Sequence, residues 1–254
     1  MKALILAAGY ATRLYPLTQN TPKPLLKLRN RPIIDYILEK IEQIGDVDRI
    51  SVVSNNKFYA QFDEWLTPKL AYSPQRYTLI NDGSNTVQDR LGGIGDICLA
   101  IEKGKIEDDL LVVAGDNLFD FNLNDFTRFS LDKKPMHSIC LYLPSSNNVD
   151  FSRFGIAQIN ESSQVVDFEE KPQIPKSNLV ATCIYFIPKE KLYLIPKYLA
   201  EGNHNDAPGS YMRWLVKNDQ VFGRICEGIW FDLGDFNAIS DALLYLNGNL
   251  TLSN

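Results

Sequence analysis

The chain has 254 residues, 45% of them hydrophobic, and a formal net charge of −5 at pH 7. These values are typical of a globular protein of one large domain or two small ones, with a core that needs no disulfides. Lysine and arginine are interspersed with acidic residues, so we expect no nucleic acid partner. No apolar run approaches the ~20 residues of a membrane span, so we expect no membrane partner.

The cysteines and histidines are too scattered for a typical metal site. No Cys-x-x-Cys pair occurs, and the residues concerned are Cys98, Cys140, Cys183, Cys226, His137 and His204. A zinc site is therefore not expected. Because nothing in this spacing requires a disulfide, the sequence indicates a reducing compartment, and we predict a cytoplasmic protein.

The first half of the chain alternates apolar strands with helical patterns. We expect strands at 3–6, 50–53, 78–80 and 110–114, and helices at 32–44, 58–68 and 94–101. Pro68 is expected to end the second of these helices, because proline lacks the N–H of a helix interior. The continuous apolar run at 110–114 is typical of a central parallel strand. The alternation indicates βαβ units.

Beyond residue 135, strands follow one another with fewer helices between them. They are expected at 136–143, 155–159, 164–168 and 179–187, with helices near 188–200, 209–217 and 235–246. We expect these strands to extend the same sheet, some of them antiparallel. No linker rich in glycine or serine divides the chain. We therefore predict a single α/β domain, residues 1–254, built on a mixed, mostly parallel central sheet.

The segment after the first strand carries residue types that suit a polyphosphate. Gly9 lets backbone approach a ligand, Arg13 follows, and Lys23 lies between two prolines that restrict its placement. Backbone N–H groups and two cations together suit an anion. The alternative is an ordinary turn with a solvated Pro-Lys-Pro, and spacing alone favours phosphate binding only slightly. The segment is neither a Walker A loop nor Gly-x-Gly-x-x-Gly.

Two aspartates follow predicted strands. Asp116 comes after the run at 111–114, with Gly115 allowing a sharp turn, and Asp232 comes after 229–231. Ligands of open α/β sheets bind beyond the carboxyl ends of the strands. Taken singly, each aspartate is expected to be solvated or to cap a helix. As a pair beside phosphate-binding elements they are suitable ligands for Mg²⁺, which takes one or two carboxylates together with substrate phosphates.

Four motifs in chain order resemble the signature of the sugar-1-phosphate nucleotidylyltransferases, in particular the glucose-1-phosphate thymidylyl- and uridylyltransferases. They are Leu6-Ala7-Ala8-Gly9 with Arg13-Leu14 and Pro22-Lys23-Pro24-Leu25, Gly115-Asp116-Asn117, Phe154-Gly155-Ile156 with Glu169-Glu170-Lys171-Pro172, and Trp230-Phe231-Asp232-Leu233-Gly234. They cover most of the chain. The resemblance implies a Rossmann-like three-layer sandwich of the nucleotide-diphospho-sugar transferase type. It assigns residues 1–134 to the nucleotide and 135–254 to the sugar phosphate.

The chain departs from this signature in the segments with which the family recognises the nucleotide base and the sugar. The second loop glycine is Ala11. No glutamine followed by Gly-Leu-Ala or Gly-Thr-Ala is recognisable in the segment 81–96, and residues 205–214 lack Glu-x-Thr-Asp. The loop 81–93 is long and polar, which suits a lid over the base. The sequence therefore does not determine which base and which sugar are bound.

The resemblance implies transfer of a nucleoside monophosphate from a triphosphate, UTP or dTTP before others, to a sugar 1-phosphate, with Mg²⁺ and release of pyrophosphate. Arg13, Lys23 and Asp116 would be catalytic, and Asp116 and Asp232 would hold the metal. The implied nucleotide site is Leu6, Ala7, Ala8, Gly9, Arg13, Lys23, Asn81, Gly93 and Asp116. The implied sugar-phosphate site is Asn117, Gly155, Glu170, Lys171 and Asn178. For Asn81, turn chemistry is an equally good explanation.

Two other functions are compatible with the motifs. One is a cytidylyltransferase acting on a small phosphate such as phosphocholine, although Glu-Glu-Lys-Pro favours a sugar. The other is a catalytically silent nucleotide or sugar-phosphate sensor, against which the intact Arg13, Lys23, Asp116 and Asp232 argue. Members of the family often form dimers or tetramers, so a homo-oligomer is compatible with this chain.

Overall fold

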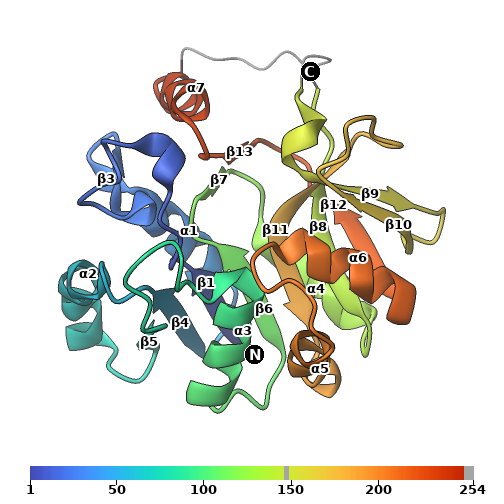
Figure 1. Ribbon diagram of the computed structural model, residues 1–254, viewed down its shortest axis with the longest axis horizontal. Helices are drawn as coiled ribbons and strands as arrows, with labels where there is room; N and C mark the ends of the chain where they lie inside the picture. The colour runs from blue at the N-terminus through green and yellow to red at the C-terminus, as the bar shows by residue number, and fades with distance from the viewer. Residues whose placement is uncertain (146–148, 249–254) are drawn as a thin grey trace.

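The computed structural model describes residues 1–145 and 149–248, and a central sheet runs through it (Figure 1). The strand order is β10-β9-β11-β6-β1-β4-β5, and β8 pairs with β11 and β12. The strands of the first half, β1 (Lys2–Leu6), β4 (Arg49–Ser54), β5 (Tyr77–Asn81) and β6 (Leu110–Ala114), are mutually parallel. Their carboxyl ends therefore meet at one edge of the sheet.

The second half adds strands that make the sheet mixed. They are β8 (His137–Tyr142), β9 (Gly155–Ile159), β10 (Val165–Glu170), β11 (Leu179–Ile187) and β12 (Val221–Ile225). Strand β11 runs antiparallel to β6, β8 and β9, and β12 runs parallel to β8. This arrangement confirms the mixed central sheet of the predicted fold class, with antiparallel strands in its second half.

Helices cover both faces of the sheet because successive side chains of a strand point to opposite faces. On β1, Ala3 and Ile5 join the core under α1 (Ile33–Glu42), α2 (Tyr59–Tyr72) and α4 (Leu123–Asp132). Leu4, between them, joins the core under α3 (Gly92–Lys103), α5 (Leu194–Ala200) and α6 (Pro208–Asn218). The three layers predicted from the resemblance are therefore present.

Two small ribbons and short 3₁₀ turns complete the described chain. Strands β2 (Lys27–Leu28) and β3 (Arg31–Pro32) form one ribbon, and β7 (Asn117–Phe119) pairs with β13 (Trp230–Asp232) in the other. The 3₁₀ turns are η1 (Thr12–Leu14), η2 (Lys23–Leu25), η3 (Phe151–Arg153) and η4 (Lys189–Lys191). Helix α7 (Phe236–Leu246) packs onto β13 and β7 through Ala242, Leu233 and Leu118. The β7–β13 ribbon matters for the site, because it sets Asp232 opposite Asn117.

The predicted strands and helices are confirmed, with one exception. Pro68 lies inside α2, which continues to Tyr72, so the prediction that it ends the helix is wrong. Proline removes one intrahelical hydrogen bond, but the last turn is held from the side. Lys69 lies over the ring of Trp65, and its Nζ is 3.1 Å from Oδ1 of Asp35 on α1. Within the described residues, no helix has the length and apolarity that crossing a membrane requires.

Candidate active site

Two cavities meet at the carboxyl ends of the parallel strands. The first, of about 450 Å³, is lined by residues of the first loop, of the start of α3 and of the ends of β1 and β6, among them Leu6, Ala8, Gly9, Arg13, Lys23, Gly93 and Asp116. The second, of about 290 Å³, is lined by Asn117, Gly155, Glu170 and Lys171 among others. They share Arg13, Asp116, Cys183, Asp206, Pro208 and Asp232. The structure thus brings most of the predicted site residues to one place.

The first loop leaves room for a ligand beside its backbone. A Cβ built on Gly9 would have no atom within 4 Å, so this position faces open space in the cavity. Ala11, where the family has a glycine, takes a left-handed conformation with φ 47°, which is unfavourable for a residue with a side chain. The hydroxyl of Thr18 donates to the Ala11 carbonyl at 2.7 Å and holds the turn. The loop therefore holds Ala11 in a conformation that glycine adopts more readily.

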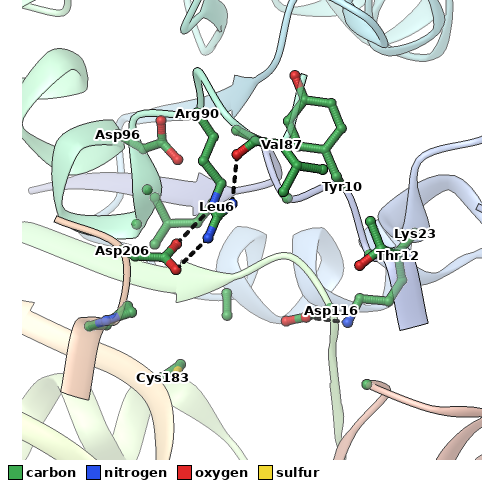
Figure 2. Close-up of a pocket in the computed structure, with 18 of the residues that line it drawn as sticks. Leu6, Tyr10, Thr12, Lys23, Val87, Arg90, Asp96, Asp116, Cys183 and Asp206 are labelled. Carbon is green, nitrogen blue, oxygen red and sulfur yellow. Dashed lines mark hydrogen bonds and ion pairs between the residues drawn. The ribbon is translucent and has the colours of Figure 1, made fainter. Parts of the chain in front are cut away.

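Lys23 and Asp116 form an ion pair where the two cavities meet. Lys23 is 9% exposed, and its Nζ lies 2.5 Å from Oδ2 of Asp116 (Figure 2). Gly115 makes this approach feasible, because its N–H donates to the Leu6 carbonyl at 2.8 Å and a Cβ there would lie 2.6 Å from that oxygen. The predicted cation and the predicted acid are thus direct neighbours.

Asp232 lies beside this pair. Burial raises the pKa of its carboxyl, and the charge of Asp116 adds to the rise, while Lys23 and Arg153 oppose it. Two neighbouring carboxylates, one of them with its pKa raised by the charge of the other, suit a divalent cation. Among the described residues, no group of three or more His, Cys, Asp or Glu side chains could hold a metal ion. Mg²⁺ is nevertheless commonly bound by only one or two protein carboxylates when the phosphates of a substrate supply further oxygen ligands.

The second cavity is organised around Glu170. Two glycines make room for its carboxyl: a Cβ on Gly209 would lie 1.7 Å from Oε2, and one on Gly155 would lie 3.2 Å from the same atom. Burial raises the pKa of Glu170, and the charges of Lys171 and Arg213 partly offset this. The Nζ of Lys171 is 3.8 Å from Oε1. A carboxylate and an ammonium therefore face one small cavity.

Four predicted residues have other surroundings. Asn81 bonds with Asn56 and with the backbone of Gly83, and neither Asn81 nor the exposed Asn178 is among the residues that line the two cavities. Ala7 is buried and is not among the residues that line the two cavities. Asn117 lines the second cavity, but its Nδ2 donates to the Thr182 carbonyl at 2.6 Å. The ligand contacts proposed for these residues stay predictions.

The structure adds four residues that the motifs did not indicate: Asp82, Arg90, Asp96 and Asp206, all lining the first cavity. Arg90 donates to both oxygens of Asp206, at 3.1 and 2.8 Å. The Asp206 carbonyl accepts from the N–H of Gly93 at 3.0 Å. The loop 82–91 is thereby tied to the start of α6 in the second half of the chain. Asp96 could have been noticed in the sequence, because it shares an otherwise apolar helix face with Ile97 and Ala100.

The comparisons with known proteins agree with this geometry. A family model described as Nucleotidyl transferase matches residues 2–248.

The chain belongs to the nucleotidyl transferase family.

Curated relatives of this chain include the bifunctional protein GlmU of Methanocaldococcus jannaschii, 28% identical over 97% of the chain and 54% of that protein. A glucose-1-phosphate thymidylyltransferase of Streptomyces griseus is 29% identical over 92% of the chain and 63% of that protein. A candidate mannose-1-phosphate guanyltransferase of Sulfolobus acidocaldarius is 29% identical over 97% of the chain and 64% of that protein. The chain thus spans about half to two thirds of these relatives' lengths.

The fold of this chain also has a solved counterpart. A crystal structure of a candidate glucose-1-phosphate thymidylyltransferase from Bacillus anthracis, in complex with a sucrose, superposes with a TM-score of 0.81. It is 24% identical and covers 100% of this chain and 98% of that one. The family resemblance and the fold class expected from the sequence are both confirmed.

Proposed function

We propose that this chain catalyses Mg²⁺-dependent transfer of a nucleoside monophosphate from a triphosphate to a sugar 1-phosphate, releasing pyrophosphate. The observation that supports this best is the Lys23–Asp116 pair at the junction of two cavities, one beside the first loop and one around Glu170. UTP or dTTP is the proposed donor, following the sequence resemblance. In this proposal the first half of the domain binds the nucleotide and the second half binds the sugar phosphate, in the cytoplasm.

Positioning and charge stabilisation carry the reaction, because the attacking phosphate oxygen is already ionised and needs no base. Lys23 neutralises charge that shifts on the α-phosphate in the transition state. Arg13 lines both cavities and binds the β- and γ-phosphates that leave. Asp116 and Asp232 would hold Mg²⁺, which supplies further positive charge to the phosphates when bound.

The second cavity binds the acceptor, the sugar 1-phosphate. Lys171 binds the phosphate of the sugar, and the carboxyl of Glu170 accepts hydrogen bonds from sugar hydroxyls. Glu170 is largely buried, so these hydrogen bonds form out of bulk water, where they discriminate well between ligands. The buried carboxyl of Glu170 therefore favours an acceptor rich in hydroxyl groups over phosphocholine, which has no alcohol hydroxyl.

Pyrophosphate exchange tests the proposal. The purified chain is incubated with labelled pyrophosphate, Mg²⁺, and each combination of UTP, dTTP, CTP, GTP and ATP with hexose 1-phosphates or phosphocholine. We expect label to enter UTP or dTTP only when a hexose 1-phosphate is present. Exchange with CTP and phosphocholine alone would favour the cytidylyltransferase, and binding of nucleotide without any exchange would favour a sensor. Either result would overturn the proposal.

A further inference from the structure

Asp96 is a buried acid without a partner in the first cavity. It lies on α3, is 5% exposed and lines the cavity wall. Its Oδ1 is fully buried and makes no hydrogen bond within the described part of the chain. Buried polar atoms almost always have a partner, and leaving one unpaired is costly. Such an atom in a binding cavity therefore points to a ligand that completes its hydrogen bonds.

Among the described residues, the charged groups around Asp96 give its carboxyl no ion pair. Asp82, after β5, and Asp206, before α6, both repel a negative charge at this position. Arg90 is already engaged in two hydrogen bonds with Asp206, and Lys103 donates to the Asn81 carbonyl. Tyr10 bonds with Ser84. Burial and the two acids raise the pKa of Asp96 to about 8.

Asp96 and the residue proposed to contact the α-phosphate lie at opposite ends of the first cavity. Lys23 and Thr12 lie at one end, while Asp96 and Asp206 lie at the other, with Arg90 beside them (Figure 2). In the function proposed above, Lys23 contacts the α-phosphate of the nucleotide. A nucleotide bound across the cavity therefore has its base at the Asp96 end. This orientation rests on the function proposed above.

A protonated carboxyl offers a donor and an acceptor side by side. The imide edge of uracil or thymine offers a complementary pair, an N3–H donor next to a carbonyl acceptor. The choice of these bases over cytosine and adenine, which also present a donor next to an acceptor, follows the nucleotide proposed above. We propose that Asp96 is the residue that reads the base, through two hydrogen bonds to the imide edge of a uracil or thymine ring. It does so at a position where the family's base-reading sequence is not recognisable.

An asparagine would present the same pair of groups without a charge, whereas an alanine would present neither. An ionised carboxylate would instead favour guanine, which has two adjacent N–H donors. If Asp96 contacts the base as a neutral carboxyl, the Asn variant should keep the contact and the Ala variant should lose it. If Asp96 is ionised, the Asn variant should change the contact as well. If the side chain does not touch the base, neither variant should change it.

Binding of UTP and of N3-methyl-UTP, which lacks the N3–H, tests the contact by a thermodynamic cycle. Dissociation constants are measured by calorimetry with Mg²⁺ for the wild type, Asp96→Asn and Asp96→Ala. Asp63→Ala, an exposed acid on α2, serves as the matched control. We expect the wild type to bind N3-methyl-UTP about tenfold or more weakly than UTP, the cost of an unpaired buried group.

We expect Asp96→Asn and Asp63→Ala to bind UTP within about threefold of the wild type. Asp96→Ala should lose about tenfold or more and should no longer distinguish UTP from N3-methyl-UTP. An unchanged ratio of the two affinities in Asp96→Ala would overturn the inference, as would equal losses in the Asn and Ala variants or a gain for GTP over UTP in the wild type. If the Ala variant does not fold, the affinities of the wild type and of the isosteric Asn variant for UTP and N3-methyl-UTP still test the contact. Failure of the proposed function would appear differently, as UTP binding without turnover in the wild type.

Discussion

The Nζ of Lys23 lies 2.5 Å from Oδ2 of Asp116, although the two residues are separated by most of the first half of the chain. Lys23 is placed by the 3₁₀ turn behind Pro22, and Asp116 by the turn at the end of β6. Each group neutralises the other in the free protein. In the proposed function, the phosphates of the substrates replace Asp116 as the partner of Lys23, and the carboxylate would then be free for a divalent cation.

Replacing Lys23 by alanine should abolish turnover without unfolding the protein. We expect kcat to fall about 100-fold or more, the typical cost of losing one group that stabilises transition-state charge. Thermal unfolding should remain cooperative, because Lys23 contributes a charge rather than a part of the apolar core. Lys27→Ala, an exposed lysine four residues away, should leave kcat unchanged. Wild-type turnover in Lys23→Ala would remove Lys23 from the mechanism.

The two aspartates should set the metal requirement. We expect chelation of divalent cations to stop turnover and added Mg²⁺ to restore it. Asp116→Asn should remain inactive at any Mg²⁺ concentration, and Asp232→Asn should need a several-fold higher concentration for half-maximal rate, because each removes a charged ligand. Steady-state rates over a Mg²⁺ titration measure this. Identical titration curves for Asp232→Asn and the wild type would exclude Asp232 as a ligand.

Arg13 should act on substrate binding. It is exposed, lines both cavities and makes no ion pair within residues 1–145 and 149–248, so its guanidinium is available to a phosphate. We expect Arg13→Ala to raise KM for the triphosphate about tenfold, since hydrogen bonds to charged groups contribute about 1.5–3 kcal/mol. Arg128→Ala, on the surface of α4, is the control. An unchanged KM in Arg13→Ala would contradict the phosphate contact.

Gly209 should govern affinity for the acceptor. A methyl group there would lie 1.7 Å from Oε2 of Glu170, so the carboxyl must leave its place in Gly209→Ala. We expect KM for the sugar phosphate to rise at least several-fold, while KM for the triphosphate changes little. Gly45→Ala, where the added methyl meets nothing within 4 Å, should change neither. Equal rises for both substrates would indicate a general distortion instead.

Asp96 should make stability depend on pH. Burial, reinforced by Asp82 and Asp206, raises its pKa to about 8, whereas an unfolded aspartate has a pKa near 4. The native state therefore holds the proton more tightly, so this residue carries no penalty below about pH 4 and destabilises the protein progressively as the pH rises to about 8. Asp96→Asn removes that penalty. We expect the variant to be more stable than the wild type by about 2 kcal/mol or more at pH 8, with the difference vanishing near pH 4. A difference that is constant with pH, in urea unfolding, would contradict this.

The parts of the fold set by local pattern were predictable from sequence. The apolar run at 110–114 and the face of 32–44 carry the periodicity of a buried strand and an amphipathic helix, and both elements are present. Pro68 does not end α2, because the ion pair of Lys69 with Asp35 on α1 holds the last turn from outside the helix. Propensity gives way to tertiary packing at such positions.

The site was predictable where family motifs carried it. Arg13, Lys23 and Asp116 line the cavities as expected, and so do Gly155 and Glu170. Asp82 lies in the cavity next to Asn81, which does not line it, because neighbouring residues of an extended chain point in opposite directions. Asp206 and Arg90 could not be paired from the sequence, since their ion pair joins residues 116 positions apart.

The most direct measurement is a crystal structure of the chain with α,β-methylene-UTP, Mg²⁺ and a hexose 1-phosphate. We predict that Lys23 leaves Asp116 and contacts the α-phosphate, that the metal lies on Asp116 and Asp232, and that the sugar phosphate reaches Lys171 with its oxygen in line with the α-phosphorus. A nucleotide bound outside the first cavity, or a Lys23–Asp116 pair unchanged in the complex, would contradict the mechanism.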